Sequence, residues 1–137
     1  MSIEWSDELL TGSEAIDRQH RELFGHFEQF SSACEAGKGV EELLELLTFL
    51  DEYVRDHFRF EEALMERSAY PGLEIQREQH LKFMEELAEL AGRVGLGLPA
   101  RSVVIGMKGK MIRFLINHVR NLDGKLGEYL RERPEPQ

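Results

Sequence analysis

Four stretches of the chain carry apolar residues at helical spacing, and glycine or proline breaks each stretch from the next. Apolar residues that recur every three or four positions lie on one side of a helix and form its packing face. Glycine favours helix ends through its backbone freedom, and proline lacks the amide hydrogen that a helix interior needs. The pattern therefore predicts four amphipathic helices, at about residues 18–37, 40–67, 73–94 and 99–131.

The links between these helices are short, at about 37–39, 70–72 and 95–98. Short links make consecutive helices run in opposite directions side by side. A length of 137 residues suits one domain with a self-supporting core. We therefore expect a single all-α domain over 1–137, an up-down-up-down antiparallel four-helix bundle with an irregular N-terminal arm at 1–17.

Charge and composition exclude several classes of partner. The chain has 26 acidic and 17 basic residues, a formal net charge of −9, and its basic residues are scattered among acidic ones. This distribution argues against nucleic acid and anionic membranes as partners. No run of eighteen apolar residues and no secretion signal is visible, and the single cysteine, Cys34, allows no internal disulfide. We expect a location in the reducing cytoplasm.

Each predicted helix carries a histidine at or beside its apolar face, and such residues can meet inside a bundle. One histidine alone would more often be an ordinary, partly buried residue. Glu61 follows His57 by four positions, so the imidazole and the carboxylate lie on one helix face. A surface pair worth about 0.3 kcal/mol is the alternative, but Phe58 and Leu64 beside the pair favour an inward position. The four histidines are His20, His57, His80 and His118.

Asp123 follows His118 by five positions, which places the two side chains about 140° apart on an ideal α-helix. Regular spacing would leave Asp123 in solvent. If both residues bind one centre, the fourth helix must contain a wide turn such as a π-bulge. Gly124, the next residue, would ease such a turn.

Imidazole nitrogens and carboxylate oxygens without thiolates suit iron, manganese or zinc. Carboxylates that can bridge favour a centre with two metal ions, as in other helical bundles. A buried carboxylate without such a partner would have to be neutralised or paired. The set therefore predicts a carboxylate-bridged pair of metal ions.

The sequence resembles the bacterial hemerythrin family over almost its whole length. No single segment is decisive, but their order and spacing together are specific. The matching segments are IEWS at 3–6, IDRQHRELF at 16–24, HFRFEEALM at 57–65, YP at 70–71, HLKF at 80–83 and FLINHV at 114–119, followed by Asp123.

The resemblance implies two non-haem iron ions joined by an oxo or hydroxo bridge. It implies that His20 and His57 bind one iron, that His80 and His118 bind the other, and that Glu61 and Asp123 bridge them. The resemblance further implies an apolar pocket for dioxygen, with walls at Leu23, Phe58, Phe114, Leu115 and Val119.

The third helix departs from the family pattern. Hemerythrins normally have His-x-x-x-His here, and this chain has Gln76 in place of the first histidine and His80 in place of the second. Gln76 lies one turn before His80 on the same face. As a seventh metal position, Gln76 either offers a weak amide oxygen or leaves the place to water or open.

The resemblance favours a cytoplasmic protein that binds dioxygen for storage, delivery or sensing, rather than an enzyme. The departure at Gln76 favours an alternative: a redox-active diiron variant whose open iron position allows peroxide or nitric oxide chemistry, or fast oxidation in air. A third hypothesis is a sensor module that works through an unidentified electron-transfer or signalling partner.

Other polar residues near the predicted ligands are expected to have no metal-binding role. His26 lies about 240° around the helix from His20 and should face solvent or a loop. Among the paired glutamates at 41–42, 61–62 and 85–86, only Glu61 has ligand spacing, and the others are expected at the surface. Tyr53, four residues before His57, is open to two interpretations: a hydrogen bond near the site, or packing of its ring one turn above.

Overall fold

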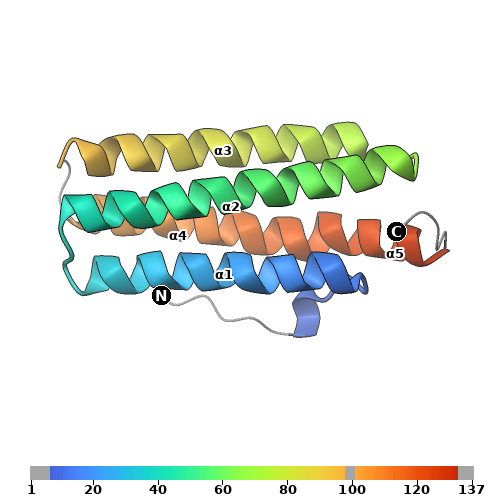
Figure 1. Cartoon of the computed structure of the whole chain (residues 1–137), viewed down its shortest axis with the longest axis horizontal. Coiled ribbons are helices and arrows are strands. Elements are labelled where there is room, and N and C mark those ends of the chain that lie inside the picture. Colours follow the sequence, from blue (N-terminus) through green and yellow to red (C-terminus); the bar gives the residue numbers. More distant parts are fainter. Residues whose placement is uncertain (1–6, 98–100, 133–137) are drawn as a thin grey trace.

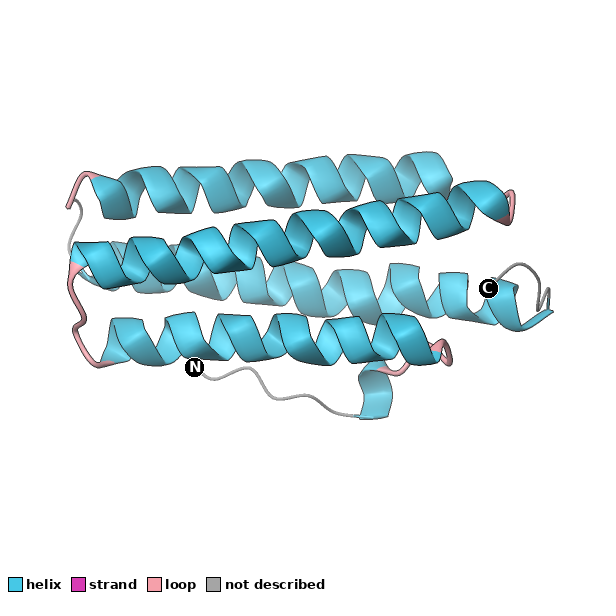
Figure 2. Cartoon of the chain, viewed as in Figure 1, coloured by secondary structure: helices cyan, strands magenta, loops and turns pink. Residues whose placement is uncertain are grey.

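The computed structural model describes residues 7–97 and 101–132. The expectations for 1–6, for Pro99 as the start of the fourth helix and for 133–137 lie outside the described residues. Figure 2 shows helices joined by short loops, and the described ranges contain no strand. The elements are η1 (Asp7–Leu9), α1 (Glu14–Glu35), α2 (Val40–Arg67), α3 (Leu73–Gly95), α4 (Arg101–Asn117), the π-helical turn η2 (His118–Asp123) and α5 (Gly124–Glu132).

The four long helical segments form an antiparallel bundle, in which α4, η2 and α5 together make the fourth segment. Figure 1 shows α1 and α3 running in one direction and α2 and α4 in the other. α2 packs against both α1 and α3, and α4 packs against α3 and α1. The predicted up-down-up-down topology is therefore confirmed. No helix in the described ranges is long and apolar enough to cross a lipid bilayer.

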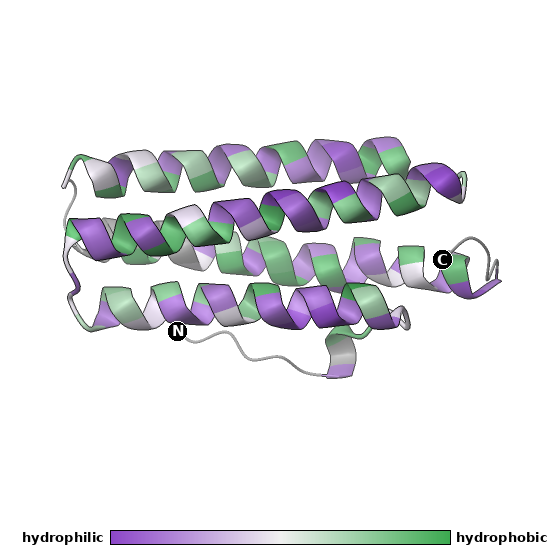
Figure 3. Cartoon of the chain, in the orientation of Figure 1, coloured by the Kyte–Doolittle hydropathy of each residue, from purple (hydrophilic) through white to green (hydrophobic). Residues whose placement is uncertain are grey.

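The buried apolar side chains fall into two clusters along the bundle axis. The larger cluster contains Phe27, Phe58 and Phe83, whose rings meet edge to face at centroid distances of 6.0 and 5.9 Å. In Figure 3 apolar and polar residues alternate around each helix, as inward and outward faces require. The smaller cluster lies toward the other end of the bundle and consists of Ile16, Leu64, Met65, Leu126 and Leu130.

The first helix begins at Glu14, four residues before the predicted start at 18. Ser13 caps it, because the side chain accepts a hydrogen bond from the amide of Ile16. The buried Asp17 carboxylate accepts hydrogen bonds from the amide and hydroxyl of Thr11, both at 2.8 Å, and from the amide of Gly12 at 3.2 Å. The arm predicted for 1–17 is thus shorter, since these polar contacts order residues that carry no apolar period.

The fourth helical segment contains the predicted wide turn. Residues His118–Asp123 form a π-helix, in which hydrogen bonds join residues five positions apart. Residues five apart therefore lie one turn apart on the same face, and both His118 and Asp123 are buried. The expected help from Gly124 is wrong, because Gly124 has ordinary α-helical angles and open space where a Cβ would stand.

Gly127 is the glycine of this segment that close packing requires. A Cβ atom at Gly127 would overlap the backbone carbonyl of Thr11. The start of the described chain thus lies directly on α5, without an intervening side chain.

We predict opposite effects for two alanine substitutions in α5. Gly127→Ala should lower the free energy of unfolding by about 1 to 3 kcal/mol, because the methyl group displaces the backbone at Thr11. Gly124→Ala should raise it by up to about 1 kcal/mol, because alanine favours helix and the position is open. Urea unfolding monitored by circular dichroism measures both, and similar effects at the two positions would contradict the close contact.

A deletion tests the π-helical turn. Removing the exposed Asn121 should convert η2 into ordinary α-helix with His118 and the aspartate four positions apart, so the unfolding free energy should change by less than about 1 kcal/mol. Removing the exposed Ala88 from α3 should cost more than about 3 kcal/mol, because Leu90 and Val94 rotate about 100° out of the core. Equal losses of unfolding free energy from the two deletions would be evidence that the π-helical turn does not tolerate the loss of one residue.

Candidate metal centre

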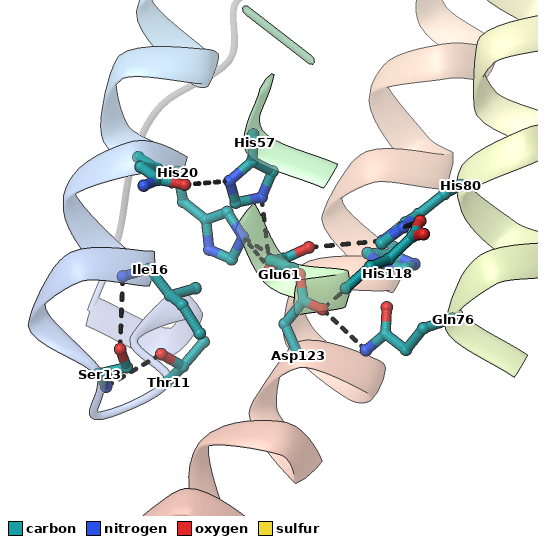
Figure 4. Close-up of polar contacts among 12 residues, drawn as sticks. Thr11, Ser13, Ile16, His20, His57, Glu61, Gln76, His80, His118 and Asp123 are labelled. Carbon is teal, nitrogen blue, oxygen red and sulfur yellow. Dashed lines mark hydrogen bonds and ion pairs between the residues drawn. The ribbon is translucent and has the colours of Figure 1, made fainter. Parts of the chain in front are cut away.

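Four histidines, one from each helical segment, converge between the two apolar clusters (Figure 4). The rings of His20 and His57 meet edge to face at a centroid distance of 4.7 Å. The rings of His80 and His118 lie 5.2 Å apart on the other side of the centre. All four side chains are buried, so the structure brings together the histidines that the sequence singled out.

Glu61 lies between the two histidine pairs. Its Oε2 is 3.4 Å from Nε2 of His20 and 3.3 Å from Nε2 of His57. Its Oε1 is 3.4 Å from Nε2 of His80. One carboxylate therefore presents one oxygen to each pair.

Asp123 repeats this arrangement from the π-helical turn. Its Oδ2 is 3.1 Å from Nε2 of His20, and its Oδ1 is 3.3 Å from Nε2 of His118. Without the wide turn, Asp123 would point away from the centre. Both acidic residues that the sequence selected thus connect the two histidine pairs.

The polar atoms of this centre lack the partners that buried groups normally have. Within the described chain, His20 and His118 have no hydrogen bond at either ring nitrogen, and neither oxygen of Glu61 has one. An unsatisfied buried polar group costs about 1 to 3 kcal/mol. Several such groups in one place therefore require a further binding partner, such as an ion. Two donors bound at right angles to one ion, each at about 2.1 Å, stand about 3 Å apart. The separations of 3.1 to 3.4 Å fit a metal ion.

The charges of the centre favour a cation. Burial alone would raise the pKa of Glu61, but the neighbouring imidazoles of His57 and His20 hold it well below its usual range. Burial and the charge of Glu61 would raise the pKa of Asp123, yet His118 and His20 keep it lowered. Burial lowers the pKa of His20, but the two carboxylates outweigh it and raise this pKa to about 10. Both carboxylates are therefore ionised and attract positive charge.

The donors form two groups that could each hold an ion. The first group consists of His20, His57, Glu61 and Asp123, and the second consists of Glu61, His80 and His118. In each group, one donor atom per residue lies within 4.8 Å of the others. Glu61 belongs to both groups, as a bridging ligand would.

Two outer hydrogen bonds orient the histidine rings. His57 Nδ1 lies 2.8 Å from the amide oxygen of Gln19, and His80 Nδ1 lies 2.7 Å from a carboxylate oxygen of Glu62. Because both partners are acceptors, each Nδ1 donates its hydrogen and each Nε2 turns a lone pair to the centre. Sequence reasoning missed both partners. Glu62, which was expected at the surface, is 29 % exposed and in addition turns a carboxylate oxygen to His80.

A signal for these two residues was present in the sequence. Gln19 and Glu62 each stand directly beside a predicted ligand, His20 and Glu61. A neighbour in sequence lies about 100° around the helix and so faces the adjacent helix. From that position a polar side chain reaches the outer nitrogen of a histidine on that helix.

The predicted apolar walls lie on one side of the centre. Phe58 stacks on His80 with a centroid distance of 3.8 Å and an interplanar angle of 6°. Phe114, which is half-buried, stacks near His118 at 6.2 Å and 16°. Leu23, Leu115 and Val119 are buried in the larger apolar cluster, to which Phe58 also belongs.

Gln76 reaches the centre through its amide nitrogen. Its side chain is buried, and Nε2 donates a hydrogen bond of 3.0 Å to Oδ1 of Asp123. Figure 4 shows this contact from α3 to the π-helical turn. The amide oxygen of Gln76 has no hydrogen-bond partner within the described residues.

His26 on α1 and Tyr53 on α2 contact each other across the two helices. The ring of His26 contacts Tyr53 at a centroid distance of 5.0 Å, and His26 belongs to neither donor group. The hydroxyl of Tyr53 donates to Glu22 at 3.0 Å and lies 3.2 Å from the backbone carbonyl of Gln19. Both interpretations of Tyr53 are confirmed, because its hydroxyl hydrogen-bonds beside the site and its ring packs against the larger apolar cluster.

Comparison with known proteins agrees with this centre. The sequence matches the family described as Hemerythrin HHE cation binding domain over residues 11–130. That range includes all seven residues predicted at the metal positions.

Three relatives illustrate the similarity. Bacteriohemerythrin from Pseudomonas aeruginosa is 33% identical over 119 residues, covering 87% of this chain and 75% of the relative. Bacteriohemerythrin from Stenotrophomonas maltophilia is 30% identical over 125 residues, with the same coverage. Myohemerythrin from Theromyzon tessulatum is 25% identical over 122 residues, covering 89% and 88%. With a buried cluster of four histidines and two carboxylates that could hold a metal, the chain belongs to the hemerythrin family of diiron, oxygen-binding proteins.

Proposed function

We propose that this protein binds two iron ions in the centre and, through them, binds dioxygen for storage, delivery or sensing. The observation that carries the proposal is the placement of Glu61 and Asp123, each with one oxygen toward each histidine pair. His20 and His57 would hold one ion and His80 and His118 the other, with both carboxylates shared. An oxo or hydroxo bridge between the ions would complete the centre. Bound iron supplies the electrons and the open coordination position that dioxygen requires.

The protein's own residues prepare the site for this role. Gln19 and Glu62 fix the tautomers of His57 and His80, so the donor atoms are oriented before a metal arrives. Phe58 and Phe114 place apolar rings beside His80 and His118, and together with Leu23, Leu115 and Val119 they would exclude water. A dry wall protects bound dioxygen from protons, which is what reversible binding needs.

A second candidate function is a redox-active diiron protein with an open iron position. The observation that favours it is the contact of Gln76, whose amide nitrogen faces Asp123 and cannot coordinate a metal. One histidine fewer would leave room for peroxide or nitric oxide to bind, or would speed oxidation in air. A surface recess lined by Phe58, Glu62, Arg77 and His80 gives small molecules a path toward that side.

The cellular setting is part of the proposal. The chain has one cysteine, so it needs no oxidising compartment for a disulfide, and the reducing cytoplasm suits ferrous iron. Delivery or sensing would require an electron-transfer or signalling partner, whereas storage would not.

We predict that the protein binds two irons per chain when Fe²⁺ is in excess and that, in this loaded form, it takes up dioxygen reversibly after anaerobic reduction. Metal analysis gives the iron content, and the visible spectrum recorded in air and again after degassing gives the reversibility. Rapid oxidation in air that degassing does not reverse would favour the redox-active variant. Failure to bind iron would refute both candidates.

We predict that Glu62→Gln weakens iron binding by about 10- to 100-fold, because the ring of His80 loses its carboxylate partner. Glu66→Gln is the matched control, since Glu66 is exposed, lies one turn away and also pairs with Arg77. Anaerobic titration with Fe²⁺ measures the affinity, and circular dichroism verifies the fold. Equal affinities of the two variants would show that Glu62 does not support the centre.

A further inference from the structure

The two donor groups of the centre are unequal in number and charge. The first group has four residues and includes both carboxylates, whereas the second has three residues and includes only Glu61. Asp123 lies 3.3 Å from Nε2 of His118 but is not among the donors that meet in the second group. Affinity for a divalent ion rises with the number and negative charge of its ligands. The protein side chains alone thus favour the ion held by His20 and His57.

Gln76 increases this inequality. It occupies the place from which a histidine on α3 would bind the second ion. Its amide nitrogen donates instead to Oδ1 of Asp123, the oxygen on the side of His118. That oxygen therefore has a competing partner when an ion binds near His80 and His118.

The orientation of the Gln76 amide follows from its neighbour. An ionised carboxylate only accepts hydrogen bonds, so Asp123 must face the NH₂ group rather than the amide oxygen. The amide oxygen then points elsewhere and can be at most a weak, neutral donor to an ion. Exchange of the two amide atoms would set two oxygens against each other at 3.0 Å.

The surface above the second group is also less favourable to a cation. Arg55, Arg59 and Arg77 line the recess that leads to His80. Arg77 Nε lies 3.5 Å from Glu62, the residue that orients His80. The recess beside His57 contains one arginine, Arg18, and two acidic residues, Glu22 and Asp56.

We propose that Gln76 makes the two metal positions unequal, so that the position of His20, His57, Glu61 and Asp123 fills first and that of His80 and His118 fills second and more weakly. The proposal rests on the metal centre of the proposed function. It adds that the protein holds a single ion over a range of metal concentrations and that Gln76 is the positioning residue that sets this range.

Anaerobic titration calorimetry with Fe²⁺ alone tests the proposal. The parent protein should bind in two steps whose affinities differ by at least about 10-fold. Gln76→His should strengthen the second step by about 10-fold or more and leave the first nearly unchanged, since an imidazole replaces the amide. Ile75→His is the matched control, because it adds a histidine to the same helix at an exposed position and should not change the gap.

Two further variants assign the steps to positions. His118→Gln should remove the weak step and keep the tight one, and His57→Gln should weaken the tight step. Circular dichroism confirms that each variant is folded, and metal analysis after gel filtration should find about one iron retained per parent chain and about two per Gln76→His chain.

Each outcome has a separate meaning. Two equal steps in the parent, or an unchanged gap in Gln76→His, would overturn the unequal positions while leaving a two-iron protein intact. Absence of binding in both steps would instead refute the metal centre and with it the proposed function.

Discussion

The structure depends on the burial of two carboxylates among four imidazoles in the middle of the helical core. Apolar side chains lie on both sides of this polar layer along the bundle axis, and several of its buried atoms have no hydrogen-bond partner among the described residues. Burying such a layer costs free energy, and part of that cost is recovered when a cation binds the donors. The bundle is therefore built around a site whose stability is linked to its occupant.

The chemistry of the centre also depends on side chains that contact its histidines and carboxylates. Gln19 and Glu62 decide which nitrogen of a histidine is available, and Gln76 decides how much of Asp123 is available. These three residues come from α1, α2 and α3, so each of these three helices contributes an outer contact as well as an inner donor. Differences between hemerythrins in affinity or reactivity can thus arise without any change in the bridging carboxylates.

The bundle topology and the meeting of the four histidines could be predicted from the sequence, because both follow from helical period and short links. Asp123 was predictable only as a condition, since its five-residue spacing fits the centre solely through a π-helical turn. The start of α1 and the roles of Gln19 and Glu62 could not be predicted from period alone. They depend on hydrogen bonds of single polar residues, which leave no repeating pattern in the sequence.

The contact of Thr11 with Gly127 has a consequence for the order in which the molecule can assemble. During synthesis, His20, His57 and Glu61 are complete long before Asp123, and α5 is needed to close the smaller apolar cluster. A nascent chain therefore has only part of the set of donor residues, and its smaller apolar cluster is incomplete. The complete set of donors therefore exists only after Asp123 and α5 have joined the bundle, so full occupation of the proposed centre would be a late event in the life of the chain.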